Sequence, residues 1–183
     1  LYLDAYTGVK DMTFDATDPQ VVYAAFQRGT MGVSPAELSR LAPLGSGIFK
    51  STDGGETWKA MAGTGLPTGV PSFELAVASG THGQRVYAEA QGTGRDAGGV
   101  YRSEDGGNSW VLGTREIGSA GGRIYADPVN PDVVYLMGTS MYRSLDGART
   151  FASYKGAPGG DDNRDLWIDP TNPHRMLMGA DQG

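Results

Sequence analysis

The segment Gly47–Trp58, GIFKSTDGGETW, decides the fold of this 183-residue chain because it recurs twice more. The second copy is Gly99–Trp110, GVYRSEDGGNSW, and a looser third copy is Ser140–Phe151, SMYRSLDGARTF. Each copy alternates apolar and polar residues, turns at an Asp-Gly pair, and reaches an aromatic residue where a second strand begins. This pattern predicts a β-hairpin, since glycine tolerates the positive φ that so tight a turn requires.

The polar residues of each turn have a structural explanation. The Asp carboxylate can accept hydrogen bonds from turn amides and nearby hydroxyls, so that the turn closes on itself. The aromatic residue then anchors the second strand in the core. We therefore predict a structural role for the motif residues, which are Ser51, Asp53, Gly55 and Trp58, then Ser103, Asp105, Gly107 and Trp110, and finally Ser144, Asp146 and Phe151.

A second repeated unit precedes each hairpin. It reads FDATDPQVVY at 14–23, YADPVNPDVVY at 125–135 and, after the third hairpin, WIDPTNPHRML at 167–177, while a degenerate copy before the second hairpin, VASGTHGQRVY, ends at Tyr87. Proline cannot donate a hydrogen bond to a sheet, so the Pro-containing segment predicts a turn between two further strands. Together the two units give four strands in about 40 residues, which is typical of one blade of a β-propeller.

The sequence thus predicts an all-β fold, a β-propeller of four-stranded antiparallel blades. Three full blades are expected near 9–62, 73–114 and 121–155, and a half blade at 165–183. We expect the remaining blades of the same ring to lie outside this sequence. Because blades bury their faces against each other, an arc of three and a half blades should expose an apolar face at each end.

Composition excludes several classes of function. The net charge of −6 leaves no basic patch for nucleic acid or an anionic membrane surface. The chain has no cysteine and only two histidines, His82 and His174, so we expect no disulfide, no metal site and no cofactor. No run of 18 apolar residues is present, which argues against a membrane span.

Three long connections mark the face of the propeller where a ligand is expected. They are residues 28–46, with a short helix predicted from Ser34, then 90–99 and 155–165. In a propeller these connections emerge on one face, and loops on a rigid scaffold often carry binding sites. The first strand of each blade is innermost, so its starting residues should border the central channel. These residues are Asp11, Glu74, Arg123 and Asp165.

The candidate site residues follow from this placement. Asp161, Asp162 and Asp165 are weak candidates for catalytic acids, and Arg123, Asp165, Asp181 and Gln182 are candidates for ligand binding. Such carboxylates can provide the general acid and base of glycoside hydrolysis, bind a hydroxyl-rich ligand or a cation, or only form a solvated loop. If they cluster, mutual repulsion should raise the pKa of at least one, unless Arg123 or a bound cation compensates.

The three tryptophans have two possible roles. Trp58, Trp110 and Trp167 could stack on sugar rings or pack in the core. Trp58 and Trp110 are the turn anchors, and Trp167 alternates within a first strand between Leu166 and Ile168. We therefore predict packing for all three.

The motifs above resemble those of a known group of proteins. The Ser-x-Asp-x-Gly-x-Thr-Trp turn is similar to the Asp-box, also called the bacterial-neuraminidase repeat. The segment GDDNRDLWIDPTNPHRMLMGADQG at 160–183, with the units upstream of it, resembles bacterial Asp-box propellers described as glycosyl-hydrolase-like or sortilin-like. The repeat pattern is also similar to that of xyloglucanase-type glycoside hydrolases.

This resemblance implies a secreted or periplasmic propeller that binds or hydrolyses glycans. The alternative that it implies is a non-catalytic, sortilin-like propeller that binds peptides or proteins on its loop face. The chain departs from the pattern at Arg164, where histidine is common, and at Ala148 and Phe151, which replace Gly and Trp in the third turn. No motif matches an identified catalytic one, so the resemblance assigns no catalytic residue.

Overall fold

The computed structural model describes residues 3, 6–28, 47–61, 65–68, 70, 72–92, 98–115, 122–155 and 162–181. Within these ranges the regular structure consists of β-strands alone. The helix expected from Ser34 lies outside the described residues, as do the candidate site residues Asp161 and Gln182.

The strands form four antiparallel sheets, and in each one the strands follow chain order. The first sheet contains β1 (Thr7–Phe14), β2 (Val22–Arg28), β3 (Gly47–Ser51) and β4 (Lys59–Ala60). The second contains β5 (Ser72–Val77), β6 (Val86–Gln91), β7 (Gly99–Ser103) and β8 (Val111–Thr114). The third contains β9 (Arg123–Ala126), β10 (Val134–Met137), β11 (Met141–Ser144) and β12 (Ala152–Lys155), and the fourth contains β13 (Asn163–Ile168) and β14 (Met176–Ala180). The prediction of four-stranded antiparallel units, with half a unit at the end, is confirmed.

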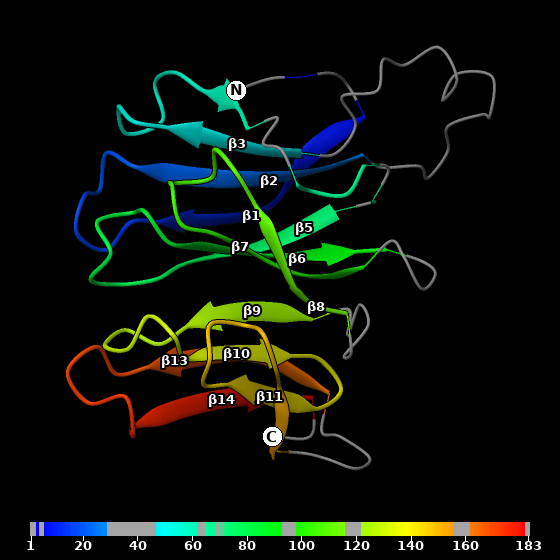
Figure 1. The fold of residues 1–183 in the computed structure, drawn as a ribbon, viewed down its shortest axis with the longest axis vertical. Helices are drawn as coiled ribbons and strands as arrows, with labels where there is room; N and C mark the ends of the chain where they lie inside the picture. The colour runs from blue at the N-terminus through cyan, green and yellow to red at the C-terminus, as the bar shows by residue number, and fades with distance from the viewer. Residues whose placement is uncertain are drawn as a thin grey trace.

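The sheets follow one another along the long axis of the molecule, from the blue end to the red end in Figure 1. Their first strands approach each other, because β1 packs beside β5, β5 beside β9, and β9 beside β13. The described fourth strands show no comparable approach. The first strands are therefore the inner ones, and the turns that join first to second strands gather on the left of Figure 1.

The core consists of apolar layers between successive sheets. Tyr23 and Ile48 of the first sheet meet Leu75 and Trp110 of the second. The next two layers are built in the same way, from the second and third sheets and from the third and fourth. Strands β5 and β6 lie between two neighbouring sheets, so all but their last residues are buried. Removal of this apolar surface from water is the main force that stacks the sheets.

The turn between the third and fourth strands, which we call the Ser-x-Asp turn, closes through its own side chains. The Ser51 hydroxyl donates to Asp53 Oδ1 at 2.7 Å and accepts from the Gly55 amide at 2.8 Å. Asp53 Oδ1 also accepts from the Thr57 amide at 2.9 Å. The Thr57 hydroxyl donates to Asp53 Oδ2 at 2.5 Å. This hydrogen bond, together with those from the Thr57 amide and Ser51, favours the ionised carboxylate and lowers the pKa of Asp53 to about 2.

The other two turns repeat this geometry. Asp105 accepts from Ser103 at 2.8 Å and from the Ser109 amide at 2.8 Å. In the third turn Ala148 adopts a φ of 66° and still donates its amide to Ser144 Oγ at 2.9 Å. The turn therefore survives the replacement of Gly, although a side chain strains this conformation. The pKa values of Asp105 and Asp146 are also lowered to about 2.

The first and second sheets each reach into the turns of the sheet that follows. Lys50 Nζ donates to the Gly106 carbonyl at 3.1 Å, and the Tyr23 hydroxyl lies 3.1 Å from the same oxygen. One sheet further on, Arg102 Nη1 donates to the Gly147 carbonyl at 2.8 Å, and the Tyr87 hydroxyl donates to the Pro131 carbonyl at 2.7 Å.

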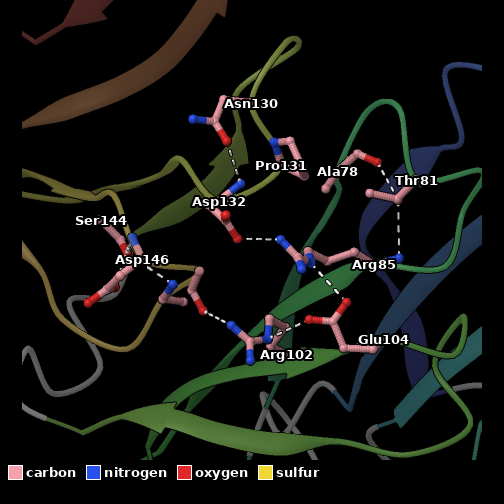
Figure 2. A network of polar contacts seen from close by, with 12 residues as sticks. Ala78, Thr81, Arg85, Arg102, Glu104, Asn130, Pro131, Asp132, Ser144 and Asp146 are labelled. Carbon is pink, nitrogen blue, oxygen red and sulfur yellow. Dashed lines mark hydrogen bonds and ion pairs between the residues drawn. The ribbon is translucent and has the colours of Figure 1, made fainter.

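Figure 2 shows the second of these junctions, where Arg85 joins two acidic side chains. Arg85 Nε contacts Glu104 Oε2 at 2.9 Å, and Arg85 Nη1 contacts Asp132 Oδ1 at 2.5 Å across the boundary between the second and third sheets. Glu104 in turn contacts Arg102 Nε at 2.9 Å. The polar network thus lies at the turn end of the interface between these two sheets.

The two ends of the arc expose apolar side chains. On β1 Val9, Met12 and Phe14 are each more than half exposed, while Trp167 is 48% and Leu177 67% exposed. The prediction that Trp167 packs in the core is wrong for the described structure, because it faces away from the third sheet. Trp58 is only partly buried for the same reason, since no described sheet covers its side of the first sheet.

The two turn tryptophans should differ in their effect on stability. Trp110 is 4% exposed between the first and second sheets, so Trp110→Ala should lower the free energy of unfolding by ~3–5 kcal/mol. Trp58→Ala should cost clearly less, because its side chain is only partly buried. Urea denaturation followed by circular dichroism measures both, and equal losses would contradict the burial described here.

The lowered pKa values of the turn aspartates predict a loss of stability in acid. The pKa of the Asp105 carboxyl is about 2 in the folded protein, while its ordinary value, which applies in the unfolded chain, is 3.8. The ionised carboxylate therefore stabilises the fold at pH values above 4. That contribution disappears as the pH falls from about 4 to about 2. Thermal melts across this range should show Asp105→Asn to be less stable than the parent at pH 7, with a smaller difference at pH 2. A difference that does not change with pH would rule out this explanation.

Candidate ligand-binding site on the inner strands

Charged and polar side chains gather along the inner strands. They are Lys10 and Asp11 on β1, Glu74 on β5, Arg123 and Tyr125 on β9, and Asp165 on β13. Arg123 and Tyr125 are two positions apart on one strand and therefore point to the same face. On β1 the pairing register shifts between Val9 and Asp11, which places Lys10 at an irregularity of the strand. We call these six residues the inner-strand site.

Glu74 is the buried carboxyl of this site, with 4% of its surface exposed. Lys10 Nζ lies 3.1 Å from Glu74 Oε1. Burial of the carboxylate raises the pKa of Glu74, and the negative charge of Asp11 raises it further. Lys10 and Arg123 oppose this shift without cancelling it. Glu74 therefore holds a proton more readily than an exposed glutamate does.

Asp165 has the opposite environment. The Tyr125 hydroxyl donates to Asp165 Oδ1 at 2.7 Å, and the Leu166 amide donates to the same oxygen at 3.0 Å. Arg123 Nη1 lies 3.5 Å from it. These contacts, led by the tyrosine hydrogen bond, lower the pKa of Asp165. Burial and the adjacent carboxylate raise the pKa of Tyr125 to about 12, so its hydroxyl remains a donor.

Two depressions of about 320 Å³ each lie on either side of this charged row. Glu74 and Arg123 line both depressions. Asp11 and Tyr125 line the first, while Lys10, Asp162 and Arg164 line the second. A small polar ligand in either depression would meet a buried carboxyl group and a guanidinium group together.

The structure brings most of the candidate residues to this region. Arg123 and Asp165 form an ion pair, and Asp162 lines the second depression. Asp181 pairs with Arg164, which lowers the pKa of Asp181. At Asp165 the exception stated with the prediction applies, because Tyr125 and Arg123 compensate its charge and lower its pKa. Arg164 does the same for Asp181. A raised pKa occurs instead at Glu74, which is buried and was not among the candidate acids.

Two members of the site were missed from the sequence. The spacing of Arg123 and Tyr125 on a predicted strand would have revealed the tyrosine. Lys10 gave no comparable signal, because the strand irregularity that orients it depends on pairing with β2.

Among the described residues, no group of three or more acidic or histidine side chains is arranged to hold a metal ion. No helix in the described part of the chain is long and apolar enough to cross a membrane.

Sheets of four antiparallel strands that converge on their first strands define a β-propeller, and this chain is a part of one. Comparison with solved structures agrees. The GH74 enzyme of Niastella koreensis superposes with a TM-score of 0.65 at 22% identity, over 90% of this chain and 25% of its own. The GH74 xyloglucanase of Xanthomonas campestris superposes with a TM-score of 0.57 at 19% identity, over 96% of this chain and 24% of its own. YCF48 bound to D1 peptide superposes with a TM-score of 0.58 at 16% identity, over 94% of this chain and 48% of its own.

No protein-family model matches the sequence, and no curated protein matches it either. These three structural neighbours are below 25% identity, so they establish the fold alone. The chain spans about a quarter of the length of the GH74 enzymes and about half of YCF48.

The raised pKa of Glu74 predicts that removing its charge stabilises the fold. Above its raised pKa, the buried carboxylate lowers the free energy of unfolding. This loss of stability vanishes below pH 4.5, the ordinary pKa of a glutamate in the unfolded chain. Glu74→Gln should therefore raise the melting temperature at pH 7, with a gain that shrinks toward pH 4. Lys10, 38% exposed at its side chain, stays solvated in this variant.

The matched control is Glu56→Gln, which changes an exposed acid on the opposite, turn side of the molecule. It should leave the melting temperature at pH 7 nearly unchanged. A destabilised Glu74→Gln protein at pH 7 would show that the Lys10 ion pair outweighs the cost of burial.

Proposed function

We propose that this chain is part of a secreted or periplasmic Asp-box propeller whose inner-strand site binds glycans and, in the catalytic form of the hypothesis, hydrolyses them. The observation that carries the proposal is the contrast in pKa between two carboxyls, those of Glu74 and Asp165, that both feel the positive charge of Arg123. Glu74 has a raised pKa and Asp165 a lowered one, and Arg123 acts on both. Pairs of carboxyls whose pKa values are pushed apart supply the acid and the base of glycoside hydrolysis.

In this proposal each residue has a defined role. Glu74 donates a proton to the glycosidic oxygen, and the ionised Asp165 acts as base or stabilises positive charge on the sugar. Arg123 and Tyr125 hold Asp165 in place, and the remaining N–H groups of Arg123 are donors for sugar hydroxyls. The structural similarity to a GH74 xyloglucanase supports the choice of xyloglucan as the first glycan to test.

A second candidate is a non-catalytic, sortilin-like propeller that binds a peptide or a protein. The similarity to YCF48 bound to D1 peptide favours it, since that neighbour covers 94% of this chain. Under this hypothesis the cations Lys10, Arg123 and Arg164 around the second depression receive carboxylates of the partner. Glu74 and Asp165 then have only an electrostatic role.

The test measures binding and turnover separately. Calorimetry with xyloglucan oligosaccharides should show binding to the parent chain that Arg123→Ala weakens at least ~10-fold, about 1.4 kcal/mol. If the site is catalytic, Glu74→Gln should reduce the release of reducing ends by ~100-fold or more while binding persists. Glu56→Gln is the matched control and should change neither quantity.

Other outcomes separate the two candidates. Binding without turnover in the parent would restrict the proposal to glycan recognition. Binding of acidic peptides but of no oligosaccharide, with loss in Arg123→Ala, would establish the second candidate. Absence of both kinds of binding would overturn the assignment of the inner-strand site.

A further inference from the structure

Glu89 of β6 is a buried carboxyl that the proposed function does not use. It stands directly opposite Glu74 in the pairing of β5 with β6. Directly opposite residues of antiparallel strands point to the same face of the sheet, with their Cβ atoms ~4.5–5.5 Å apart. The chain therefore buries two carboxyl groups side by side, with exposed fractions of 4% for Glu74 and 0% for Glu89.

The neighbouring pairs of residues on these two strands show which face carries the carboxyls. Two positions nearer the turn, Ala76 and Tyr87 belong to the apolar layer between the second and third sheets. Two positions in the other direction, the Ser72 hydroxyl donates to Gln91 Oε1 at 2.9 Å. Side chains of opposite residues thus reach each other on this face. The two glutamates lie between these pairs and point into the interface with the third sheet.

The charged groups nearest to Glu74 come from the inner strands on either side of it. From β1, Lys10 Nζ lies 3.1 Å from Glu74 Oε1. Asp11 is placed beside the pair, because its Oδ2 accepts at 2.7 Å from the amide of the residue that follows Glu74. From β9 come Arg123 and Tyr125, both of which contact the aspartate of β13.

The outer side of the pair is less polar. On β7 the residue opposite Glu89 is Val100. Arg102 of the same strand points to the same face, but its guanidinium belongs to the polar network at the turn end in Figure 2. Arg115, which follows β8, lies on the other face, where its Nη2 is 3.5 Å from the Tyr101 hydroxyl.

Ionising both carboxyls of the pair is costly. Like charges a few ångströms apart in a low-dielectric interior repel each other, and each one also loses its hydration. Burial and the negative charge of Asp11 raise the pKa of Glu74, and Lys10 and Arg123 offset this rise only in part. One proton on the pair removes the repulsion between the two glutamates and leaves a single negative charge beside Lys10.

We propose that Glu74 and Glu89 form a buried carboxyl pair that holds one shared proton at neutral pH. The two groups titrate as a unit, so that the first proton leaves at acidic pH and the last one above neutral pH. Because Glu74 lines both depressions, loss of the last proton adds a negative charge to the inner-strand site. The inference does not depend on the glycan or peptide function, since it concerns proton binding by the chain alone.

The experiment measures how many protons the chain takes up when it folds. In the unfolded chain both carboxyls are ionised above about pH 5, so the folded pair holds one extra proton between about pH 5 and pH 7. Over this range the unfolding constant of the parent should rise about tenfold more per pH unit than that of the double variant Glu74→Gln/Glu89→Gln, which cannot bind this proton. Urea denaturation at several pH values measures both constants.

The single variants test whether the proton is shared. Either Glu74→Gln or Glu89→Gln alone should remove most of this pH dependence, because each leaves one carboxylate beside a neutral amide of the same size. Glu56→Gln, which changes an exposed carboxyl, is the matched control and should keep the full pH dependence of the parent.

The remaining outcomes would overturn the proposal. Equal pH dependence in the parent and in Glu89→Gln would show that Glu74 holds its proton without Glu89. Single-variant effects that add up in the double variant would show two independent groups. In the parent itself, carbon-13 NMR of the glutamate carboxyls should show Glu74 and Glu89 both responding at the same two pH values. One separate midpoint for each residue would also contradict the shared proton.

Discussion

The structure depends on one constraint, which is that each four-stranded sheet has two apolar faces and can bury them only against neighbouring sheets. Tyr23, Tyr87 and Tyr135 each lie at the start of a second strand and fill the layer toward the following sheet. The first and last sheets each have one face that no described sheet covers. Apolar side chains on those faces, such as Phe14 and Leu177, are exposed. Stability in such an array is a sum over interfaces between neighbours, so the interfaces decide the architecture.

The Ser-x-Asp turns serve these interfaces as well as their own hairpins. Each turn is closed internally by its Asp, which leaves the glycine carbonyl free to accept from the preceding sheet. Lys50 and Arg102 use that acceptor in the same way, although their side chains differ. The turn is thus both the end of one hairpin and the contact point for the previous blade, which explains why its sequence recurs so closely.

The inner-strand site has the opposite character, because its residues follow no repeat. Asp11, Glu74, Arg123 and Asp165 occupy comparable places on four strands but differ in charge and burial. Glu74 is buried and near a like charge, while Asp165 has a tyrosine and an arginine as partners. A regular scaffold thus carries an irregular set of charges at its centre, where the strands converge and a ligand can contact several of them at once.

The sequence by itself determined the strands, the turns and the four-stranded unit, because glycine, proline and Asp-Gly pairs act on the local backbone. It also placed four of the inner-strand residues, since the start of a first strand is a position in the repeat. Only the tertiary structure decided that Glu74 has the raised pKa while Asp165 and Asp181 have lowered ones, that Lys10 joins the site, and that Trp167 is exposed although Trp110 is buried as predicted. Those properties depend on which neighbour lies across an interface, and that information is absent from the local spacing of residues.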